Sequence, residues 1–290
     1  MFDKGRVNIV MENETSNYYF GSVKFFRHLI IGSIVLILVL LIVAVGVLSV
    51  KCIDYAKIVQ NQAVLVETGS DKGVSLLSSN SFVWQRDKKV FLTFDDGPNK
   101  LTETVLDVLA ANHIKATFFV VGNQITSETE PILKRMVKEG HTIGVHTTTH
   151  NYEKIYKSVD SYLDDFYETY DKIYEATGVR AEIFRFPGGS QNAYNEATCK
   201  EIIKKMEQRG FKYFDWNASA EDADNNANRK SVIKNALKGT ELKSDTILLM
   251  HDNKACTVES LDEIINEYKE KGYNFDSLDK RVKQVSFVNR

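Results

Sequence analysis

Two histidines that stand four residues apart, His146 and His150, enclose three threonines in the stretch HTTTH. Two imidazoles can share one metal ion when their rings converge. On an extended strand these positions lie about 13 Å apart, which is too far for ligands bonded at about 2.1 Å. A shared ion therefore requires that a strand ends at His146 and that the chain turns. The alternative is a pair of capping or core histidines, which we also expect for His113 and His141.

Two adjacent carboxylates, Asp95 and Asp96, follow the apolar run KVFLTF in the stretch TFDDGP. Consecutive side chains point in different directions and like charges repel, so the two acids are expected to divide the work. One can ligate a metal and the other can act as a general base. The alternative, a surface turn rich in Asp, Gly and Pro, does not explain two acids directly after a buried strand.

Three further polar features complete the set. Arg185 stands in the apolar stretch FRFPGG and needs a carboxylate partner if it is buried, whether for catalysis or as a structural ion pair. The glycine pair that follows, Gly188 and Gly189, leaves a backbone N–H able to approach a substrate closely. His251 ends the apolar run TILLM and is a candidate general acid, because the imidazole pKa lies near neutrality.

The elements that position these residues alternate between short apolar runs and amphipathic stretches from Lys89 onward. Such alternation predicts parallel strands joined by crossover helices, in either a doubly wound sheet or a barrel. Only six or seven strand–helix units are visible, so a barrel of eight units would be incomplete. The polar features follow the carboxyl ends of the strands, which face one mouth in a parallel barrel, so we expect a single site. The predicted strands are 89–94, 116–121, 141–146, 182–186, 211–216 and 246–250, with a last one near 273–275.

Three predicted helices carry apolar residues at helical spacing. Four glycines stand just past helical stretches, where a helix ends in a left-handed residue: Gly140, Gly178, Gly210 and Gly272. The three apolar stripes are Leu101, Val105, Val108 and Leu109; Cys199, Ile202, Ile203 and Met206; and Leu261, Ile264, Ile265 and Tyr268.

The composition excludes several classes of protein. The chain has 290 residues, 43% of them hydrophobic and 26% charged, which suits one domain with additional segments. A net charge of −2 without a basic block gives no electrostatic footprint for nucleic acid. Three scattered cysteines are too few for a disulfide framework or a CxxC zinc site, and a Cys199–Cys256 pair stays open.

An uncharged run from Leu29 to Val50 is long enough to cross a membrane, which takes about 20 apolar residues. Lys24 and Arg27 just before it favour an N-terminus inside and a catalytic domain outside the cell. The alternative is a cleaved signal peptide, while Lys51 before Cys52 disfavours a lipoprotein. The predicted segments are a cytoplasmic N-terminus (1–28), a single-pass anchor in the cell membrane (29–50), an extracytoplasmic stem (51–88) and a catalytic domain (89–290).

The motifs TFDDGP, HTTTH, FRFPGG, DWNASAEDA and LLMHD, in this order, resemble those of polysaccharide deacetylases of carbohydrate esterase family four. The resemblance covers residues 88–280 and extends to membrane-anchored peptidoglycan N-acetylglucosamine deacetylases. It implies an α/β fold, a distorted and incomplete (β/α) barrel of the TIM type with six to seven βα units. It also implies one divalent metal ion, zinc with cobalt or nickel as alternatives, bound by Asp96, His146 and His150.

The same resemblance implies the remaining roles. Asp95 is the general base, Arg185 holds it ionised, and His251 protonates the departing amine. Asp222 in the fourth motif orients that histidine.

On the substrate side, the Gly188 N–H stabilises the oxyanion, Leu249 lines the pocket for the acetyl methyl, and Trp216 begins the fourth motif. The sequence departs from the family pattern at two positions. Gly188 stands where a tyrosine is common, which removes a wall of the sugar cleft. Ala223 stands where a tryptophan is common.

The expected reaction is hydrolysis of N-acetyl groups on N-acetylglucosamine residues of cell-wall peptidoglycan, which releases acetate. One alternative substrate is another surface or extracellular polysaccharide, such as poly-N-acetylglucosamine or a chitin-like chain. A non-catalytic glycan-binding domain of the same fold is the alternative of a different class. No nucleic acid and no protein partner are expected.

Overall fold

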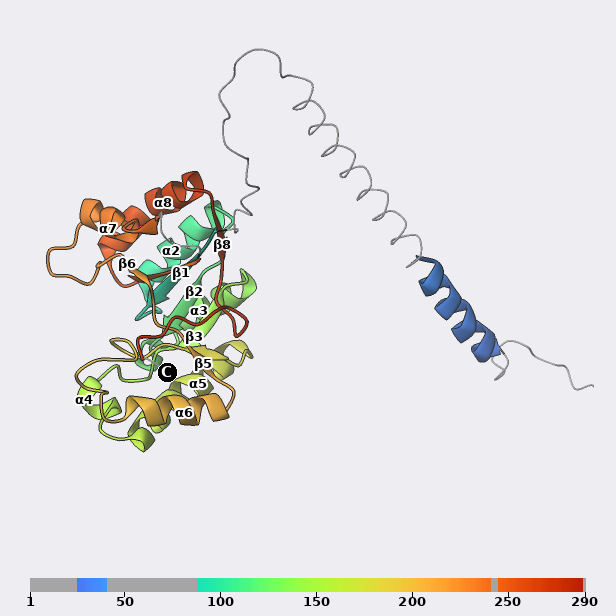
Figure 1. Ribbon diagram of the computed structural model, residues 1–290, viewed down its shortest axis with the longest axis horizontal. Helices are drawn as coiled ribbons and strands as arrows, with labels where there is room; N and C mark the ends of the chain where they lie inside the picture. Colours follow the sequence, from blue (N-terminus) through green and yellow to red (C-terminus); the bar gives the residue numbers. More distant parts are fainter. Residues whose placement is uncertain (1–24, 41–87, 241–244, 289–290) are drawn as a thin grey trace, which may run out of the picture. The chain divides into compact units, whose positions relative to one another are not determined.

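The computed structural model of the chain describes residues 25–40, 88–240 and 245–288. The chain divides into two compact units, Met1–Ser81 and Phe82–Arg290. In the first unit, residues 25–40 form one helix, drawn in blue in Figure 1. Within the described ranges, no helix is both long enough and apolar enough to cross a membrane. Residues 41–50 of the predicted span from Leu29 to Val50 and residues 51–87 of the predicted stem lie outside the described residues, so both the anchor and the stem stay predictions.

Eight parallel strands form one sheet in the second unit (Figure 1). Their order is β5-β4-β3-β2-β1-β7-β6, and β8 also pairs with β1. The strands are β1 (Lys88–Asp95), β2 (Thr117–Val120), β3 (Thr142–Val145), β4 (Ile183–Phe184), β5 (Lys212–Tyr213), β6 (Ala218–Ser219), β7 (Asp245–His251) and β8 (Tyr273–Asp276).

The connecting helices cover this sheet. Figure 1 shows α7 and α8 toward one end of the row of strands and α4, α5 and α6 toward the other. The helices are α2 (Lys100–Ala111), α3 (Glu130–Lys138), α4 (Tyr152–Ile155), α5 (Val159–Thr177), α6 (Cys199–Gln208), α7 (Arg229–Ala236) and α8 (Ala255–Glu270), with a short 3₁₀ turn η1 (Gly122–Gln124).

The barrel is incomplete, as predicted. The two ends of the strand order, β5 and β6, do not pair with each other in the part of the chain that the structure describes. Two predicted strands, 182–186 and 211–216, are reduced to the two-residue strands β4 and β5. Strand β6 was not predicted, because two residues of small side chains carry neither an apolar run nor an alternating pattern.

The helical stripes are confirmed in α6 and α8, where all eight predicted residues are buried. In α2 the buried face is Thr102, Val105, Leu106 and Leu109, and the predicted Leu101 and Val108 lie together at one edge of it, where they are half-buried. Thr102 faces inward because its hydroxyl bonds the buried Asp252 and caps the helix start. The four glycines past helices have φ of 74° to 84°, which confirms them as helix ends.

The parallel register brings the polar ends of the strands to one edge of the sheet. Asp95 at the end of β1 is paired with His251 at the end of β7. Val145 of β3 is paired with Phe184 of β4, so the residues that follow them also lie side by side. Since every pairing is parallel, the residues at these strand ends share one mouth.

Candidate active site

The HTTTH stretch begins directly after strand β3, so the chain is free to turn between the two histidines. Strand β3 ends at Val145, and Thr147 and His150 have φ of 71° and 52°. These left-handed residues turn the chain back, and the two imidazole ring centroids come to 5.1 Å from each other. An extended segment would separate them by more than twice this distance.

A buried carboxylate on α5, Asp165, anchors this turn. It accepts hydrogen bonds from the Thr148 N–H (2.6 Å), the Thr149 N–H (3.1 Å) and the Thr149 hydroxyl (2.7 Å). The threonines between the histidines therefore hold the turn in place. Sequence reasoning missed Asp165, although a single acid among the buried residues of an amphipathic helix was a detectable signal.

Asp96 completes a three-residue group with the two histidines. Its φ of 75° turns the side chain away from that of Asp95. Its Oδ1 lies 3.4 Å from His150 Nε2 and 3.7 Å from His146 Nε2. Two ligands bonded tetrahedrally at about 2.1 Å lie about 3.4 Å apart, so these three atoms fit around one ion.

The chemistry of this group fits a divalent cation. The Oδ1 atom of Asp96 is buried and has no hydrogen-bond partner among the described residues. A buried carboxylate oxygen without a donor is costly, and a metal ion supplies the missing partner. One carboxylate and two imidazoles suit zinc or a similar borderline metal. The geometry thus gives a possible metal site at Asp96, His146 and His150.

The ring of His146 is oriented for binding. Its Nδ1 lies 2.9 Å from the Arg185 carbonyl oxygen, which can only accept a hydrogen bond, so Nδ1 carries the proton and Nε2 presents its lone pair. Burial, together with the neighbouring His150, lowers the pKa of His146 to about 3. The ring is therefore neutral at physiological pH, which is the state that binds metal.

The second carboxylate of the pair, Asp95, faces Arg185. Its Oδ1 accepts a 2.9 Å hydrogen bond from Nη1 of the fully buried guanidinium. Burial raises the pKa of Asp95, and the Arg185 charge opposes that rise. The other guanidinium donors reach the Thr93 hydroxyl (2.7 Å) and the carbonyl oxygens of Phe214 (2.9 Å) and Asp215 (3.4 Å).

His251 lies beside Asp95 in register and is held by Asp222. Its Nδ1 is 2.8 Å from Asp222 Oδ1, and its backbone N–H donates to Oδ2 at 2.6 Å. Thr257 also donates to Oδ2, so three groups orient this carboxylate. Burial alone would lower the pKa of His251, but the hydrogen bond and charge of Asp222 raise it to about 9.

The TFDDGP turn requires its glycine. A Cβ at Gly97 would collide with the carboxylate of Asp252, which is fully buried beneath the turn. Asp252 Oδ2 accepts a 2.8 Å hydrogen bond from the Thr102 hydroxyl, and burial raises the pKa of this acid to about 7. The turn that carries the two acids thus packs directly on the residue after His251.

The loop that carries Gly188 is held by Asp215, which sequence reasoning missed. Gly188 has φ of 73°, is exposed, and its N–H meets no acceptor among the described residues. The Asp215 carboxylate accepts from the Ser190 N–H (2.8 Å), the Ser190 hydroxyl (2.5 Å) and the Phe287 N–H (2.7 Å). An acid directly after an apolar run, as at Asp95, was the signal that could have found it.

Leu249 lies near His251, and Trp216 lies near Arg185. Leu249 is buried on β7, and a spacing of two residues puts it on the same face of the strand as His251. Trp216 is half-buried, packs edge-on against Phe287 at 4.9 Å, and its ring lies 5.7 Å from the Arg185 guanidinium carbon.

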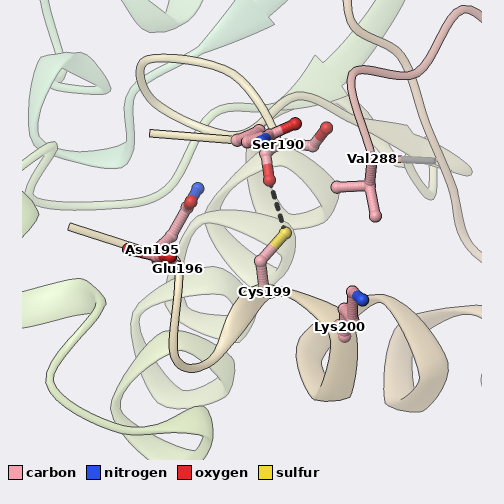
Figure 2. Close-up of a pocket in the computed structure, with 7 residues that line it drawn as sticks. Ser190, Asn195, Glu196, Cys199, Lys200 and Val288 are labelled. Atoms are coloured by element: carbon pink, nitrogen blue, oxygen red, sulfur yellow. Dashed lines mark hydrogen bonds between the residues drawn. The ribbon is translucent and has the colours of Figure 1, made fainter. Parts of the chain in front are cut away.

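A separate pocket of about 430 Å³ lies beside Ser190 (Figure 2). Cys199 lines it, and its thiol donates to the Ser190 carbonyl oxygen at 2.7 Å. Burial raises the pKa of this thiol to about 12, so it is not a thiolate nucleophile. Cys199 and Cys256 are both free, which answers the open question of their pairing.

Comparisons with known proteins identify the family of the chain. The family model of polysaccharide deacetylases matches residues 84–214. A peptidoglycan-N-acetylglucosamine deacetylase of Bacillus cereus is 30% identical over 253 residues, which is 84% of this chain and 90% of that protein. The chain belongs to the polysaccharide deacetylase family. Its fold is similar to the catalytic domain of peptidoglycan N-acetylglucosamine deacetylase from Eubacterium rectale, with a TM-score of 0.66, 30% identity, and coverage of 77% of this chain and 98% of that one.

A second solved member of the family bears on the metal. The family 4 acetyl xylan esterase from Clostridium thermocellum, solved in complex with a cobalt ion, has a TM-score of 0.57 and 30% identity. The match covers 66% of this chain and 88% of that one. The chain thus shares its fold with a relative that was solved with a metal ion, and it has a possible metal site of its own at Asp96, His146 and His150.

Metal binding should follow this geometry. The His146→Ala variant should lose at least about tenfold in affinity for zinc or cobalt, because one of three ligands is removed. The Asp95→Asn variant should retain metal binding, because Asp95 Oδ1 pairs with Arg185 and the residue stands outside the group of three ligands, although its Oδ2 lies 3.6 Å from His146 Nε2. Isothermal titration calorimetry of the full chain distinguishes the two, and equal affinities for both variants would contradict the assignment.

The support given by Asp215 predicts a loss of stability. Asp215→Asn removes a charged acceptor from three donors and should lower the free energy of unfolding by about 2–3 kcal/mol in urea titrations. Asp164→Asn is the matched control, because Asp164 is exposed on α5. A difference below about 0.5 kcal/mol between the two variants would show that Asp215 does not hold the loop.

Proposed function

We propose that the chain removes N-acetyl groups from N-acetylglucosamine residues of cell-wall peptidoglycan and releases acetate. One observation carries the proposal. A carboxylate and a histidine, Asp95 and His251, lie opposite each other in register on β1 and β7, and the possible metal site adjoins them. Amide hydrolysis needs a base for water and an acid for the departing nitrogen, and these two residues supply both.

The overall reaction adds water across the amide: the C–N bond breaks, acetate leaves, and the sugar keeps an amine. A divalent ion held by Asp96, His146 and His150 would polarise the acetamide carbonyl and make water more acidic. Asp95 takes a proton from the attacking water. Arg185 favours the ionised form of Asp95 at that step, since its guanidinium opposes the rise in pKa caused by burial.

His251 returns a proton to the departing nitrogen. Because Asp222 raises its pKa to about 9, the imidazole is protonated at neutral pH and can donate. An amine leaves poorly without a proton, so this histidine supplies what cleavage of an amide needs. Asp222 also fixes the ring, because its two oxygens bond the imidazole and the backbone N–H of the same residue.

A backbone N–H group is proposed to bind the substrate. The exposed N–H of Gly188 donates to the oxygen of the reacting carbonyl as negative charge develops on it. A backbone donor does not depend on the side chain at this position, so glycine preserves the function. Leu249 offers an apolar surface near His251 for the acetyl methyl, and Trp216 borders Arg185. The metal is proposed to be zinc, with cobalt or nickel as alternatives.

Acetate release tests the reaction. The full chain with zinc or cobalt should release acetate from an N-acetylglucosamine tetramer and from purified peptidoglycan, and Asp95→Asn should lower kcat by at least about 100-fold. Asp164→Asn is the control. Release from the tetramer alone would favour another surface polysaccharide. No release with any metal or glycan, together with measurable glycan binding, would favour a non-catalytic glycan-binding domain.

The pH dependence tests the acid. His251 has a raised pKa, so its proton is present below about pH 9 and is lost as the pH rises through that value. The alkaline limb of kcat/KM should therefore fall near pH 9. In Asp222→Asn the hydrogen bond and the negative charge are lost while burial remains, so the limb should move toward neutral pH. A limb that stays at the same pH in this variant would exclude His251 as the titrating acid.

A further inference from the structure

Position 188 is a glycine, yet the space beside it is occupied. A Cβ atom placed on Gly188 would lie 3.0 Å from the hydroxyl oxygen of Tyr152 and 3.3 Å from Asn192 Nδ2. Tyr152 comes from the chain just after the metal-site residue His150, at the start of α4. Tyr152 thus lies against the Gly188 loop, at the position where glycine replaces the tyrosine that is common in the family.

Tyr152 lies between the possible metal site and this loop. Its ring centroid is 5.4 Å from that of His150 and 5.3 Å from that of Tyr194. Below it, Tyr156 is buried and donates a 2.7 Å hydrogen bond to the Pro187 carbonyl oxygen. Asn192 bonds the same carbonyl oxygen and also accepts from the Tyr194 N–H, so the loop and both rings are held together.

The rings of Tyr152 and Tyr194 are accessible to a ligand. Tyr194 is 53% exposed and Tyr152 is half-buried. The Tyr152 hydroxyl makes no hydrogen bond to any of the described residues, although its ring packs on three neighbours. A phenol keeps its proton at neutral pH, because its ordinary pKa is about 10. It is therefore a donor beside the Gly188 N–H.

We propose that Tyr152 is a substrate-binding residue whose ring, with that of Tyr194, forms the wall of the cleft for the N-acetylhexosamine unit that is deacetylated. The hydroxyl of Tyr152 donates to a hydroxyl oxygen of this sugar. Tyrosine suits the task because it offers an apolar face to the C–H groups of a pyranose and a polar tip to its oxygens. The inference rests on the proposed function, since it names the group that holds that substrate.

Kinetics of the zinc-loaded full chain test the wall. With an N-acetylglucosamine tetramer as the probe, Tyr152→Ala and Tyr194→Ala should each raise KM at least about fivefold. Tyr152→Phe keeps the ring and should raise KM by about two- to threefold through loss of the donor. Zinc affinity should stay within about twofold of the unmodified chain, because no proposed ligand is changed. Tyr174→Ala, at an exposed tyrosine of α5, is the matched control.

Two measurements separate this inference from the proposed function. If the unmodified chain releases acetate and KM is unchanged in both alanine variants, the proposed role of Tyr152 and Tyr194 is wrong, while the proposed reaction is supported. If the unmodified chain releases no acetate, the Kd for the same tetramer decides. Binding that weakens at least about fivefold in Tyr152→Ala supports the wall without the reaction, and binding that is unchanged or absent in the unmodified chain overturns it.

Discussion

Arg185 is fully buried, so its positive charge must find negative or polar partners inside the protein, and the rest of the site is arranged around them. The guanidinium bonds Asp95 and reaches the carbonyl oxygen of Asp215, while the Arg185 carbonyl oxygen orients His146. One residue thus connects the proposed base, a possible metal ligand and the residue that supports the Gly188 loop. A buried ion pair gains little stability, but removing one partner leaves an uncompensated charge, which makes the arrangement specific.

Several residues of the proposed site have a left-handed backbone conformation, at the points where the chain leaves the strands. Asp96, Thr147, His150 and Gly188 all have φ between 52° and 75°. For non-glycine residues such conformations cost free energy and persist only where surrounding contacts impose them. Asp165 and Asp252 supply such contacts beneath the two turns. These turns separate the directions of Asp95 and Asp96 and bring the two histidine rings together.

Local pattern was enough for much of this architecture. The longer strands β1, β2, β3 and β7 were predicted, because each lies in a largely apolar run. The alternation of such runs with amphipathic stretches indicated parallel strands and therefore one common edge for the polar residues. The two-residue strands β4, β5 and β6 are defined by pairing with a neighbour rather than by their own residues. Their lengths could not be predicted from local pattern.

The sequence by itself determined which residues could do chemistry. Asp95, Asp96, His146, His150, Arg185 and His251 are unusual for their positions, and parallel strands required them to share one edge. Only the tertiary structure decided how they are held: Asp165 and Asp215 beneath the loops, and Tyr152 beside Gly188. The physical reason is that periodicity is a property of neighbouring residues, whereas the partner of a buried polar group is chosen by long-range packing, across intervals such as the 90 residues between Asp95 and Arg185.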